Sequence, residues 1–282
     1  MRMQFSRASW LFAASMVIIV NAISVVEVDL VFPRNETYSP AQVFPIVFAI
    51  QNSEKAQLLN PALTYWINKP DNRSDELVPL SAYIYLERHN VSTSDPYLTY
   101  RFYSGLQPGR WLLAWELEYQ TCNVGAEHLS DALTYNVYRS SRIFTIANST
   151  STPPREVDLV AATADDRCPA DSNAVAINVT DTTMQTIPSI NWAGRDTCVV
   201  TTNSNSASPI HTPNPCGVSI SPEVAASISA NFTAQKCNEA RPPAWVNCPA
   251  DGESAAQQLI ILAFSGLLAI CGAFAFTLAQ PW

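Results

Sequence analysis

Signatures of the common catalytic and metal-binding classes are missing from this sequence. It contains no G-x-S-x-G nucleophile motif, no H-E-x-x-H zinc motif, and neither of two glycine-rich phosphate-binding motifs, the P-loop and G-x-G-x-x-G. It also has no C-x-x-C pair, and its histidines, His89, His128 and His211, are not at ligand spacing from a cysteine or from one another. The sequence therefore predicts no catalytic residue, no cofactor-binding residue and no metal ligand.

Charged residues are also few, and acids outnumber bases. Asp, Glu, Lys and Arg make up 14% of the 282 residues, and the formal net charge is −8. An acidic surface argues against nucleic acid and anionic lipid as partners, because both carry negative charge. A simpler interpretation is that the excess of acidic residues keeps the protein soluble.

The N-terminus has the pattern of a secretory signal peptide. Arg2 and Arg7 precede an apolar stretch at 10–20, and Val-Asn-Ala then supplies a small-residue cleavage site after Ala22. The apolar stretch is short for a membrane span, so a cleaved signal over residues 1–22 is favoured over a retained signal anchor. Cleavage removes two arginines and no acid, which takes the net charge from −8 to −10.

Cysteine usage fits an exported chain. Six cysteines lie between the two terminal segments: Cys122, Cys168, Cys198, Cys216, Cys237 and Cys248. In an oxidising compartment they predict three disulfides, whereas Cys271 lies inside the apolar tail. Only Cys122 precedes a Ser/Thr/Pro-rich segment at 149–156, so if all six pair, one disulfide joins Cys122 to the second half of the chain. The alternative is that Cys122 and one other cysteine are free thiols.

Six N-x-S/T sequons are spread along the chain, each with a residue other than proline in the middle. Their asparagines are Asn35, Asn72, Asn90, Asn148, Asn178 and Asn231. In an exported chain, six such sites predict that several carry N-glycans. A glycan cannot be buried, so these positions are expected at the surface.

Residues 23–148 have the pattern of a succession of short strands. In "VVEVDLVF", residues 25–32, apolar positions alternate with Glu27 and Asp29, as in a half-buried strand. Further strands are expected at 43–52, 62–68, 80–87, 97–103, 111–119 and 142–146. About seven short strands without a strong amphipathic helix predict an antiparallel β-sandwich over 23–148.

One local motif supports this fold class. In "GLQPGRWLLAWELEY", Leu106, Pro108 and Gly109 stand directly before a strongly alternating strand. The stretch resembles the L-x-P-G-x-Y start of the F strand in immunoglobulin-like and fibronectin-type sandwiches. Trp111 stands at the tyrosine-corner position, so the hydroxyl-to-backbone hydrogen bond of that corner cannot be made. We therefore expect an immunoglobulin-like antiparallel β-sandwich.

The second half of the chain has a different composition. Residues 149–156 are typical of a linker or exposed loop. Residues 157–250 are rich in cysteine, threonine, serine and asparagine, and predict a loop-rich, disulfide-linked region that is packed on the sandwich or bridged to it. Within it, Ser221 as N-cap and Pro222 at the first helical position predict a helix to about Lys236.

One pair of carboxylates offers a catalytic alternative. Glu116 and Glu118 share a face of the expected strand at about 7 Å, which is within the range of glycosidase carboxyl groups. The opposite face of that strand is apolar, so a solvated surface explains both glutamates better than catalysis does. A secreted copper oxygenase is excluded, since cleavage after Ala22 leaves Ile23 rather than histidine as the first residue.

Aromatic residues on the expected strands offer a binding alternative. These residues are Trp66, Tyr83, Tyr85, Tyr100 and Tyr103. A row of exposed rings on one sheet face could stack on sugar rings. Aromatic residues of β-sandwiches, however, more often belong to the core or to cross-strand pairs, and packing is the favoured interpretation.

The C-terminal residues 251–282 carry a second membrane signal. Residues 259–279 contain no charge and are long enough to span a bilayer as a helix. No Lys or Arg follows them as a stop-transfer signal, and small residues upstream offer Gly252 or Ala250 as the acceptor of a GPI anchor. The polar spacer is shorter than usual, which leaves the acceptor open. We favour a GPI-attachment signal over a retained transmembrane helix.

Taken together, these features resemble a group of fungal cell-surface proteins with a domain of unassigned function. The resemblance rests on the signal peptide, the sequons, the six cysteines, the apolar terminus and the stretches "FPRNETYSPAQVFPIVFAIQN" and "LQPGRWLLAWELEY". It implies a secreted glycoprotein anchored at the outer face of the plasma membrane or in the cell wall, and it carries over no catalytic residue. We expect an adhesive, wall-associated or ligand-binding protein that is not an enzyme, with cell-wall carbohydrate as a candidate partner. The alternatives are a cell-surface carbohydrate-active enzyme and a single-pass membrane protein with an extracellular sandwich.

Overall fold

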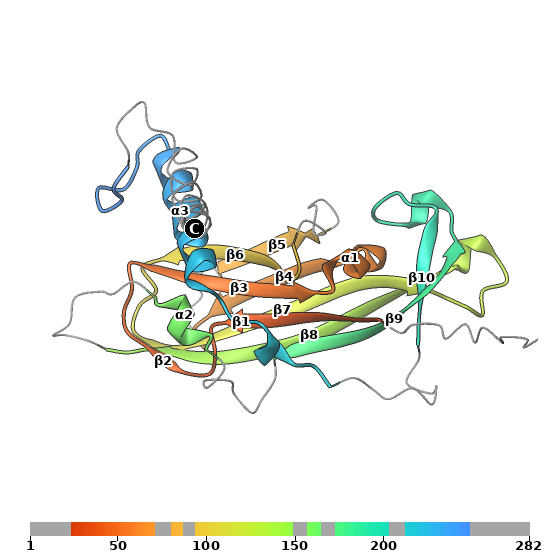
Figure 1. Ribbon diagram of the computed structural model, residues 1–282, viewed down its shortest axis with the longest axis horizontal. Coiled ribbons are helices and arrows are strands. Elements are labelled where there is room, and N and C mark those ends of the chain that lie inside the picture. Colours follow the sequence, from red (N-terminus) through yellow and green to blue (C-terminus); the bar gives the residue numbers. More distant parts are fainter. Residues whose placement is uncertain are drawn as a thin grey trace, which may run out of the picture.

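Two five-stranded sheets form the body of the protein (Figure 1). The structure, a computed structural model, describes residues 24–70, 80–86, 94–148, 157–164, 173–202 and 212–248. In the first sheet the strand order is β10 (Thr197–Thr201), β9 (Ala174–Gln185), β1 (Ser24–Phe32), β3 (Val43–Gln51) and β6 (Tyr97–Ser104). In the second sheet it is β2 (Thr37–Tyr38), β8 (Leu133–Ile146), β7 (Gly109–Cys122), β4 (Ala62–Asn68) and β5 (Leu80–Tyr85).

Within the described residues, one α-helix is long and the others are short. The three α-helices of the described residues are α1 (Ser53–Ala56), α2 (Leu159–Ala162) and α3 (Pro222–Cys237). The 3-10 turns of the described residues include η1 (Gln57–Leu59), η4 (Leu129–Asp131), η6 (Pro188–Ile190) and η7 (Pro215–Gly217). The protein is therefore mainly β, as the sequence predicted.

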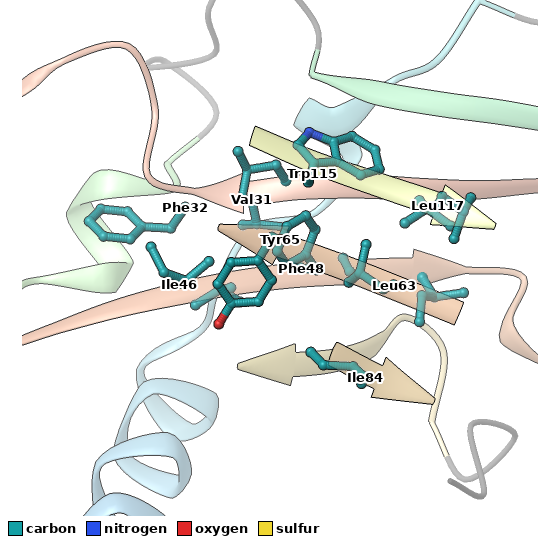
Figure 2. Packing of buried hydrophobic residues seen from close by; sticks show 14 of the residues in the cluster. Val31, Phe32, Ile46, Phe48, Leu63, Tyr65, Ile84, Trp115 and Leu117 are labelled. Atoms are coloured by element: carbon teal, nitrogen blue, oxygen red, sulfur yellow. The ribbon is translucent and has the colours of Figure 1, made fainter. Parts of the chain in front are cut away.

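Buried aromatic and aliphatic side chains fill the space between the two sheets (Figure 2). The ring of Phe48, from the first sheet, lies 5.5 Å from the rings of Tyr65 and Trp115, which come from the second. Farther along the core, the rings of Phe44 and Phe144 stack across the sheets at 5.1 Å. All five side chains are buried, so hydrophobic burial and ring packing hold the sheets together.

Strand β7 follows the alternation in its sequence. Trp111, Leu113, Trp115 and Leu117 are buried, whereas the residues between them are partly exposed. This is expected of a strand, because successive side chains point to opposite faces. β8 pairs with β7 along the whole of both strands. The predicted strands at 111–119 and 142–146 are confirmed, and both extend further.

The turn before β7 is closed by the side chain of Trp111. Its indole Nε1 donates a hydrogen bond to the carbonyl oxygen of Gln107 at 2.9 Å. The ammonium group of Lys69 lies 5.2 Å from the centre of the indole ring, and its Nζ donates to the carbonyl oxygen of Pro108 at 2.8 Å. The sequence correctly excluded a hydroxyl bond at this corner. It did not predict that the indole N–H makes a bond to the backbone four residues upstream instead.

The outer face of the first sheet is covered by α3, by α2 and by the segment around η7 (Figure 1). Phe232 of α3 is buried, and its ring lies 4.6 Å from that of Phe102 on β6. Beneath this cover, Val47 and Ala49 on the outer face of β3 are fully buried. The first sheet is thus the middle layer of the molecule.

The central strand β1 is consequently buried on both faces, and the predicted half-buried pattern is wrong. Glu27 and Asp29 point away from the core as expected, yet they are only 8% and 0% exposed. β1 contacts η7, which lies nearly 190 residues farther along the chain. The alternation in a strand indicates which side chains face the core, but not whether a distant segment covers the other face.

Strands β9 and β10 were not predicted. Both lie beyond residue 148, and β9 pairs with β1 from Ser24↔Val179 to Asp29↔Ala174. Part of the region 157–250, expected to be loop-rich, therefore completes the first sheet rather than only packing on it. The predicted linker at 149–156 lies outside the described residues.

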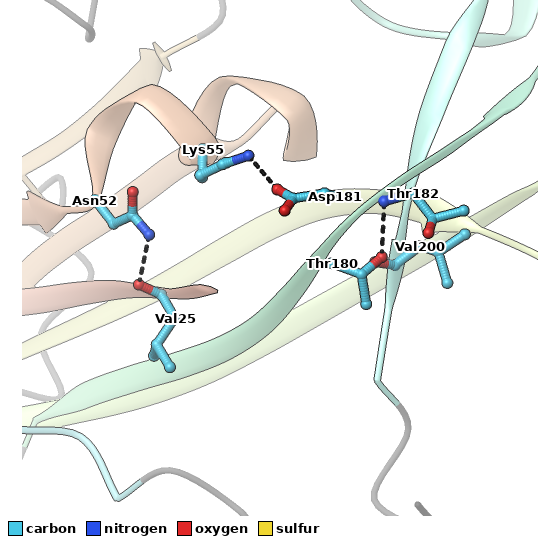
Figure 3. A network of polar contacts seen from close by, with 7 residues as sticks. All are labelled: Val25, Asn52, Lys55, Thr180, Asp181, Thr182 and Val200. Atoms are coloured by element: carbon cyan, nitrogen blue, oxygen red, sulfur yellow. Dashed lines mark hydrogen bonds and ion pairs between the residues drawn. The ribbon is translucent and has the colours of Figure 1, made fainter. Parts of the chain in front are cut away.

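Helix α1 and the residue before it contact two neighbouring strands of the first sheet, β1 and β9 (Figure 3). Asn52, which precedes the helix in a left-handed conformation with φ 55°, donates from Nδ2 to the carbonyl oxygen of Val25 at 3.2 Å. Lys55 forms an ion pair with Asp181 of β9. On the same strand, Thr180 Oγ1 donates to the carbonyl oxygen of Val200 at 2.7 Å and so joins β9 to β10.

The helix predicted from Ser221 to about Lys236 is confirmed as α3, and it begins at the predicted residue. Ser221 Oγ accepts a hydrogen bond from the backbone N–H of Val224, Pro222 is the first helical residue, and α3 ends at Cys237, one residue beyond the expected Lys236. Within the described residues, no helix is both long and apolar enough to cross a membrane. The apolar run 259–279 lies outside those residues.

Candidate functional site

A cleft of about 270 Å³ lies between α3 and the outer face of the first sheet. We call it the α3 cleft. Its floor is formed by the start of β3 and by β6, and its walls by α3, by the residues that lead into α2, and by the loop after α3. The lining residues are Gln42, Val43, Pro45, Phe102, Val157, Leu159, Ile228, Ser229, Phe232, Thr233, Trp245, Val246 and Asn247.

Three aromatic rings in series form one side of the α3 cleft. The ring of Phe232 lies between that of Phe102, at 4.6 Å, and that of Trp245, at 6.1 Å. The rings of Phe232 and Trp245 are nearly parallel, with an angle of 14° between their planes. Trp245 is 43% exposed, so part of the indole face is open to a ligand.

A disulfide holds Trp245 in place. Cys237, the last residue of α3, is bonded to Cys248, with the two Cα atoms 5.5 Å apart. Trp245 lies in the short loop between these cysteines. Closing this loop limits the positions that the indole can adopt, so the disulfide keeps the ring beside Phe232.

The cleft is apolar with a few neutral polar groups. Among the described residues that line it, none carries a charge, and Gln42, Thr233 and Asn247 supply amides and a hydroxyl. Thr233 Oγ1 already donates to the carbonyl oxygen of Ser229 at 3.0 Å, which leaves its lone pairs as acceptors. Such a lining suits a small neutral ligand with an apolar face and polar edges.

A second unusual group is a pair of carboxyl side chains on the outer face of β1. The pKa of Asp29 is raised from its ordinary value of 3.8 to about 8, mainly by burial and also by a hydrogen bond with Glu27. Gln51 Nε2 donates to Asp29 Oδ2 at 2.8 Å, which lowers the pKa of Asp29, though by less than burial raises it. Asp29 therefore carries a proton at neutral pH. That proton allows two buried carboxyl groups to form a hydrogen bond instead of repelling one another.

The carboxylates considered for catalysis lie on the outer face of the second sheet. Glu116 forms an ion pair with Arg139 of the neighbouring strand β8. Glu118 Oε2 accepts a hydrogen bond from the hydroxyl group of Tyr83 at 3.3 Å. Neither glutamate lines the α3 cleft. Glu116 thus pairs with the neighbouring strand β8, and Glu118 reaches across β4 to Tyr83 on β5, so both side chains interact within the outer face of the sheet.

The strand aromatics considered for sugar binding do not form one row. Trp66 and Tyr83 belong to the second sheet, and Tyr100 and Tyr103 to the first. The hydroxyl group of Tyr103 donates to that of Tyr65 at 3.1 Å, toward the core. The side chain of Tyr85 lies outside what the structure describes. The rings that do gather around a cleft are Phe102, Phe232 and Trp245.

Two disulfides are placed by the structure. Cys122 at the end of β7 is bonded to Cys198 in β10, which confirms that one bridge joins Cys122 to the second half of the chain. This disulfide links the second sheet to the first. The other disulfide is Cys237–Cys248. Cys216 is also disulfide-bonded, and Cys168 lies outside the described residues.

The sequon asparagines differ in exposure. Asn35, Asn148 and Asn231 are exposed, whereas Asn178 on β9 is half-buried and its Oδ1 is buried without a hydrogen-bond partner. Glycosylation of these sites remains a prediction. The other predicted positions lie outside the described residues: Asn72, Asn90, the cleavage site at Ala22 and the GPI acceptors Ala250 and Gly252.

Some features of the site could not be found from sequence motifs. Asp29 was expected at a solvated face, and Trp245 was not singled out. A tryptophan between two nearby cysteines, as in "CNEARPPAWVNC", is a signal that could have found Trp245. Within the described residues, no group of three or more His, Cys, Asp or Glu side chains is placed to hold a metal ion.

The fold and the cleft define a disulfide-linked, mainly β protein with a small neutral cleft beneath α3. The chain belongs to the DUF7136 family, a domain of unknown function whose family model matches residues 21–246. The matched residues include both sheets and all of the residues that line the α3 cleft except Asn247. No curated protein matches the chain.

Proposed function

We propose that this chain is an exported, non-enzymatic glycoprotein of the cell surface that binds a neutral carbohydrate in the α3 cleft. Export is supported by the signal-like pattern over residues 1–22 and by the disulfides, which form and persist in oxidising compartments. Exposed sequon asparagines support glycosylation. The apolar residues 259–279 support attachment to the outer face of the membrane through a GPI anchor.

The observation that carries the binding proposal is the exposed face of Trp245 beside an uncharged cleft. A sugar ring has an apolar face that stacks on an indole, and hydroxyl groups at its edge that need donors and acceptors. Trp245 offers the stacking surface, and Gln42 and Asn247 offer amide groups. A charged ligand would gain nothing from this lining, because burying an unpaired charge is costly.

A binding role has more support than a catalytic one. Glu116 is ion-paired with Arg139, and Glu118 is hydrogen-bonded to Tyr83, on a sheet face away from the cleft. A glycosidase needs one carboxyl group that gives up a proton and another that stays charged, with the substrate bound between them. The α3 cleft contains no carboxyl group among its described lining residues.

We also propose an immunoglobulin-like arrangement for the two sheets. The support is local: the Leu106-x-Pro108-Gly109 turn leads into β7, and Trp111 bonds back to Gln107 as a tyrosine-corner residue would. Cross-strand contacts measured by solution NMR that follow the strand order of an immunoglobulin domain would support this proposal, and a different order would rule it out.

The binding proposal is tested with the protein secreted from a host that forms disulfides. Neutral cell-wall polysaccharides and their oligosaccharides are presented on an array, and the affinity of each ligand bound is then measured by titration calorimetry. Replacing Trp245 by Ala is expected to weaken binding about fivefold, because an aromatic contact of this kind contributes on the order of 1 kcal/mol. The matched control is Trp192→Ala, since Trp192 is equally exposed at 43% and does not line the cleft.

Two outcomes would contradict the binding proposal. In one, no neutral glycan binds, or only apolar or charged ligands do. In the other, Trp245→Ala and Trp192→Ala bind a glycan equally well, which would place the binding surface elsewhere. The anchor is tested separately by treating cells with a phosphatidylinositol-specific phospholipase C. If the protein stays on cells from which known GPI-anchored proteins are released, a retained transmembrane helix replaces the GPI anchor.

A further inference from the structure

A second groove lies on the opposite flank of α3, against β6. We call it the β6 groove. Its volume is about 340 Å³, and it is lined by Tyr100, Arg101, Phe102, Asn231, Phe232, Gln235 and Lys236. Phe102 and Phe232 separate this groove from the α3 cleft, because they line both.

One of the lining residues is a sequon asparagine. Asn231, Phe232 and Thr233 form the sequon, and the Asn231 side chain is exposed within the groove. Its Nδ2 donates a hydrogen bond to the hydroxyl oxygen of Tyr100 at 2.8 Å. The atom that an N-glycan would modify is therefore held at the surface of β6 and not directed into open solvent.

We propose that Asn231 carries an N-glycan whose first sugar lies in the β6 groove and holds α3 against the first sheet. In the reaction, Nδ2 of Asn231 loses one proton and bonds to C1 of the first N-acetylglucosamine. The leaving group is the lipid pyrophosphate of the oligosaccharide donor, and no oxidation or reduction takes place. This inference requires export to the secretory pathway, but it does not depend on ligand binding in the α3 cleft.

The hydrogen bond to Tyr100 is compatible with the glycan. A primary amide has two N–H groups, and glycosylation consumes one, so the second can still donate to the Tyr100 hydroxyl. The first sugar then starts at a fixed point above β6. From there it reaches the ring of Tyr100 and the side chain of Gln235, which is one helical turn beyond Asn231.

The groove suits an N-acetylglucosamine unit. Tyr100 and Phe102 present aromatic surface for the apolar face of the sugar, and their own rings lie 5.6 Å apart. Gln235 and Arg101 provide donors for the acetamido carbonyl and the hydroxyl groups. Lys236 forms an ion pair with Glu239 and lies 5.9 Å from the ring of Phe232, so its charge is partly compensated at the groove edge.

The other two exposed sequon asparagines of the described residues have no comparable surroundings. Asn35 and Asn148 are exposed, but neither lines the α3 cleft or the β6 groove. Glycans there would extend into solvent and contribute little to folding. The glycan on Asn231 would instead contact both α3 and β6, so its removal should loosen the helix. Asn35 and Asn148 therefore serve as matched controls.

The experiment begins with the protein secreted from a host that performs N-glycosylation, and occupancy is mapped by mass spectrometry of glycopeptides. Three glycoforms are compared by thermal unfolding: the intact protein, the protein trimmed by an endoglycosidase to one N-acetylglucosamine per site, and Asn231→Gln. Trimming is expected to leave the melting temperature unchanged, because the first sugar fills the groove. Asn231→Gln is expected to lower it by about 3 °C, with no comparable effect of Asn35→Gln or Asn148→Gln.

A second variant separates the glycan from the asparagine itself. Tyr100→Ala removes the proposed stacking surface, whereas Tyr100→Phe keeps the ring and loses only the hydroxyl that accepts from Asn231. Both are measured in the glycosylated chain and in Asn231→Gln. Tyr100→Ala and Asn231→Gln should be non-additive, with a larger coupling than Tyr100→Phe and Asn231→Gln, whereas Tyr100→Ala and Asn148→Gln should be additive.

Three results would overturn the inference. The first is an unoccupied Asn231 in secreted protein. The second is a melting temperature that falls as much on trimming to one sugar as in Asn231→Gln. The third is full additivity of Tyr100→Ala and Asn231→Gln. Occupancy of Asn35 and Asn148 in the same sample shows whether export and glycosylation took place, so a failure at Asn231 is distinguishable from a failure of the proposed export.

Discussion

Trp115 Nε1 donates a hydrogen bond to Asn173 Oδ1 at 2.8 Å in the interior of the protein. Trp115 belongs to β7 in the second sheet, and Asn173 directly precedes β9 in the first. Ser140 Oγ donates to the same oxygen, and the carbonyl oxygen of Asn173 accepts from the backbone N–H of Leu30 at 3.0 Å. A single asparagine, 3% exposed, therefore satisfies polar groups from three strands.

This arrangement predicts a large effect of Asn173→Ala. The substitution leaves the indole N–H of Trp115 buried without an acceptor, which costs on the order of 1–3 kcal/mol of unfolding free energy. Replacing Trp115 by Phe in the same background removes the unpaired donor. In a double-mutant cycle followed by urea unfolding, the coupling between the two substitutions should be about 1 kcal/mol or more. Additive effects would show that the hydrogen bond contributes nothing specific to the joining of the sheets.

The strands of the first half of the chain could be predicted because their alternation is a local property. The inward row of β7, with Trp115 and Leu117, is visible in the sequence as a period of two. β9 carries the same signal in "AVAINVT", where Val175, Ile177 and Val179 alternate, but the surrounding threonine and asparagine obscured it. In the second half of the chain, the period-two alternation would therefore have predicted this strand better than the amino-acid composition did.

Contacts between distant segments could not be predicted. The sequence gives no local sign that residues near η7 cover Asp29, or that the loop with Trp245 folds back on Phe232. Both depend on where the chain returns after β10, and the energy that decides this comes from tertiary packing. The α3 helix itself was predictable, because its cap at Ser221 is encoded within a few residues.

The raised pKa of Asp29 predicts a specific loss of stability as pH rises from about 4 to about 8. Between pH 4 and pH 8 the folded protein holds a proton on Asp29 that the unfolded chain releases, since its pKa is about 8 when folded and 3.8 ordinarily. Folding is therefore favoured at the acid end of this window, and the free energy of unfolding contributed by this group falls as pH rises through it.

Replacing Asp29 by Asn tests this directly. The amide keeps the size of the side chain and can donate to Glu27 without titrating. As pH rises through the window, the unfolding free energy of the variant should increase relative to that of the wild type. The increase should be up to about 1.4 kcal/mol for each pH unit. The control is Glu54→Gln, because Glu54 is exposed. A difference between Asp29→Asn and wild type that is independent of pH would show that Asp29 is charged in the folded protein.

The bond from Trp111 to Gln107 predicts different results for two aromatic replacements. Trp111→Phe keeps a ring beside Lys69 but loses the donor, so the unfolding free energy should fall by about 1–2 kcal/mol. Trp111→Tyr restores a donor of the kind that such corners normally use, and should recover part of the loss. Chemical denaturation of the three proteins is the measurement. Equal losses for Phe and Tyr would mean that ring volume, and not the hydrogen bond, matters at this corner.

The two placed disulfides should have separable effects, because they close loops of very different length. Cys122–Cys198 spans 76 residues and joins the two sheets, and the chain-entropy model assigns it about 4 kcal/mol of global stability. Cys237–Cys248 spans 11 residues, which corresponds to about 3 kcal/mol, but it closes only the loop after α3.

We therefore expect Cys122→Ala with Cys198→Ala to lower the melting temperature measured by circular dichroism. Cys237→Ala with Cys248→Ala should leave that transition nearly unchanged and weaken ligand binding, since Trp245 is then free to leave Phe232. Hydrogen exchange would show the same contrast, with faster exchange confined to the loop and the end of α3. If the second double variant bound its ligand as tightly as the wild type, the disulfide would have no part in positioning Trp245, and the apolar contact with Phe232 alone would have to hold the ring.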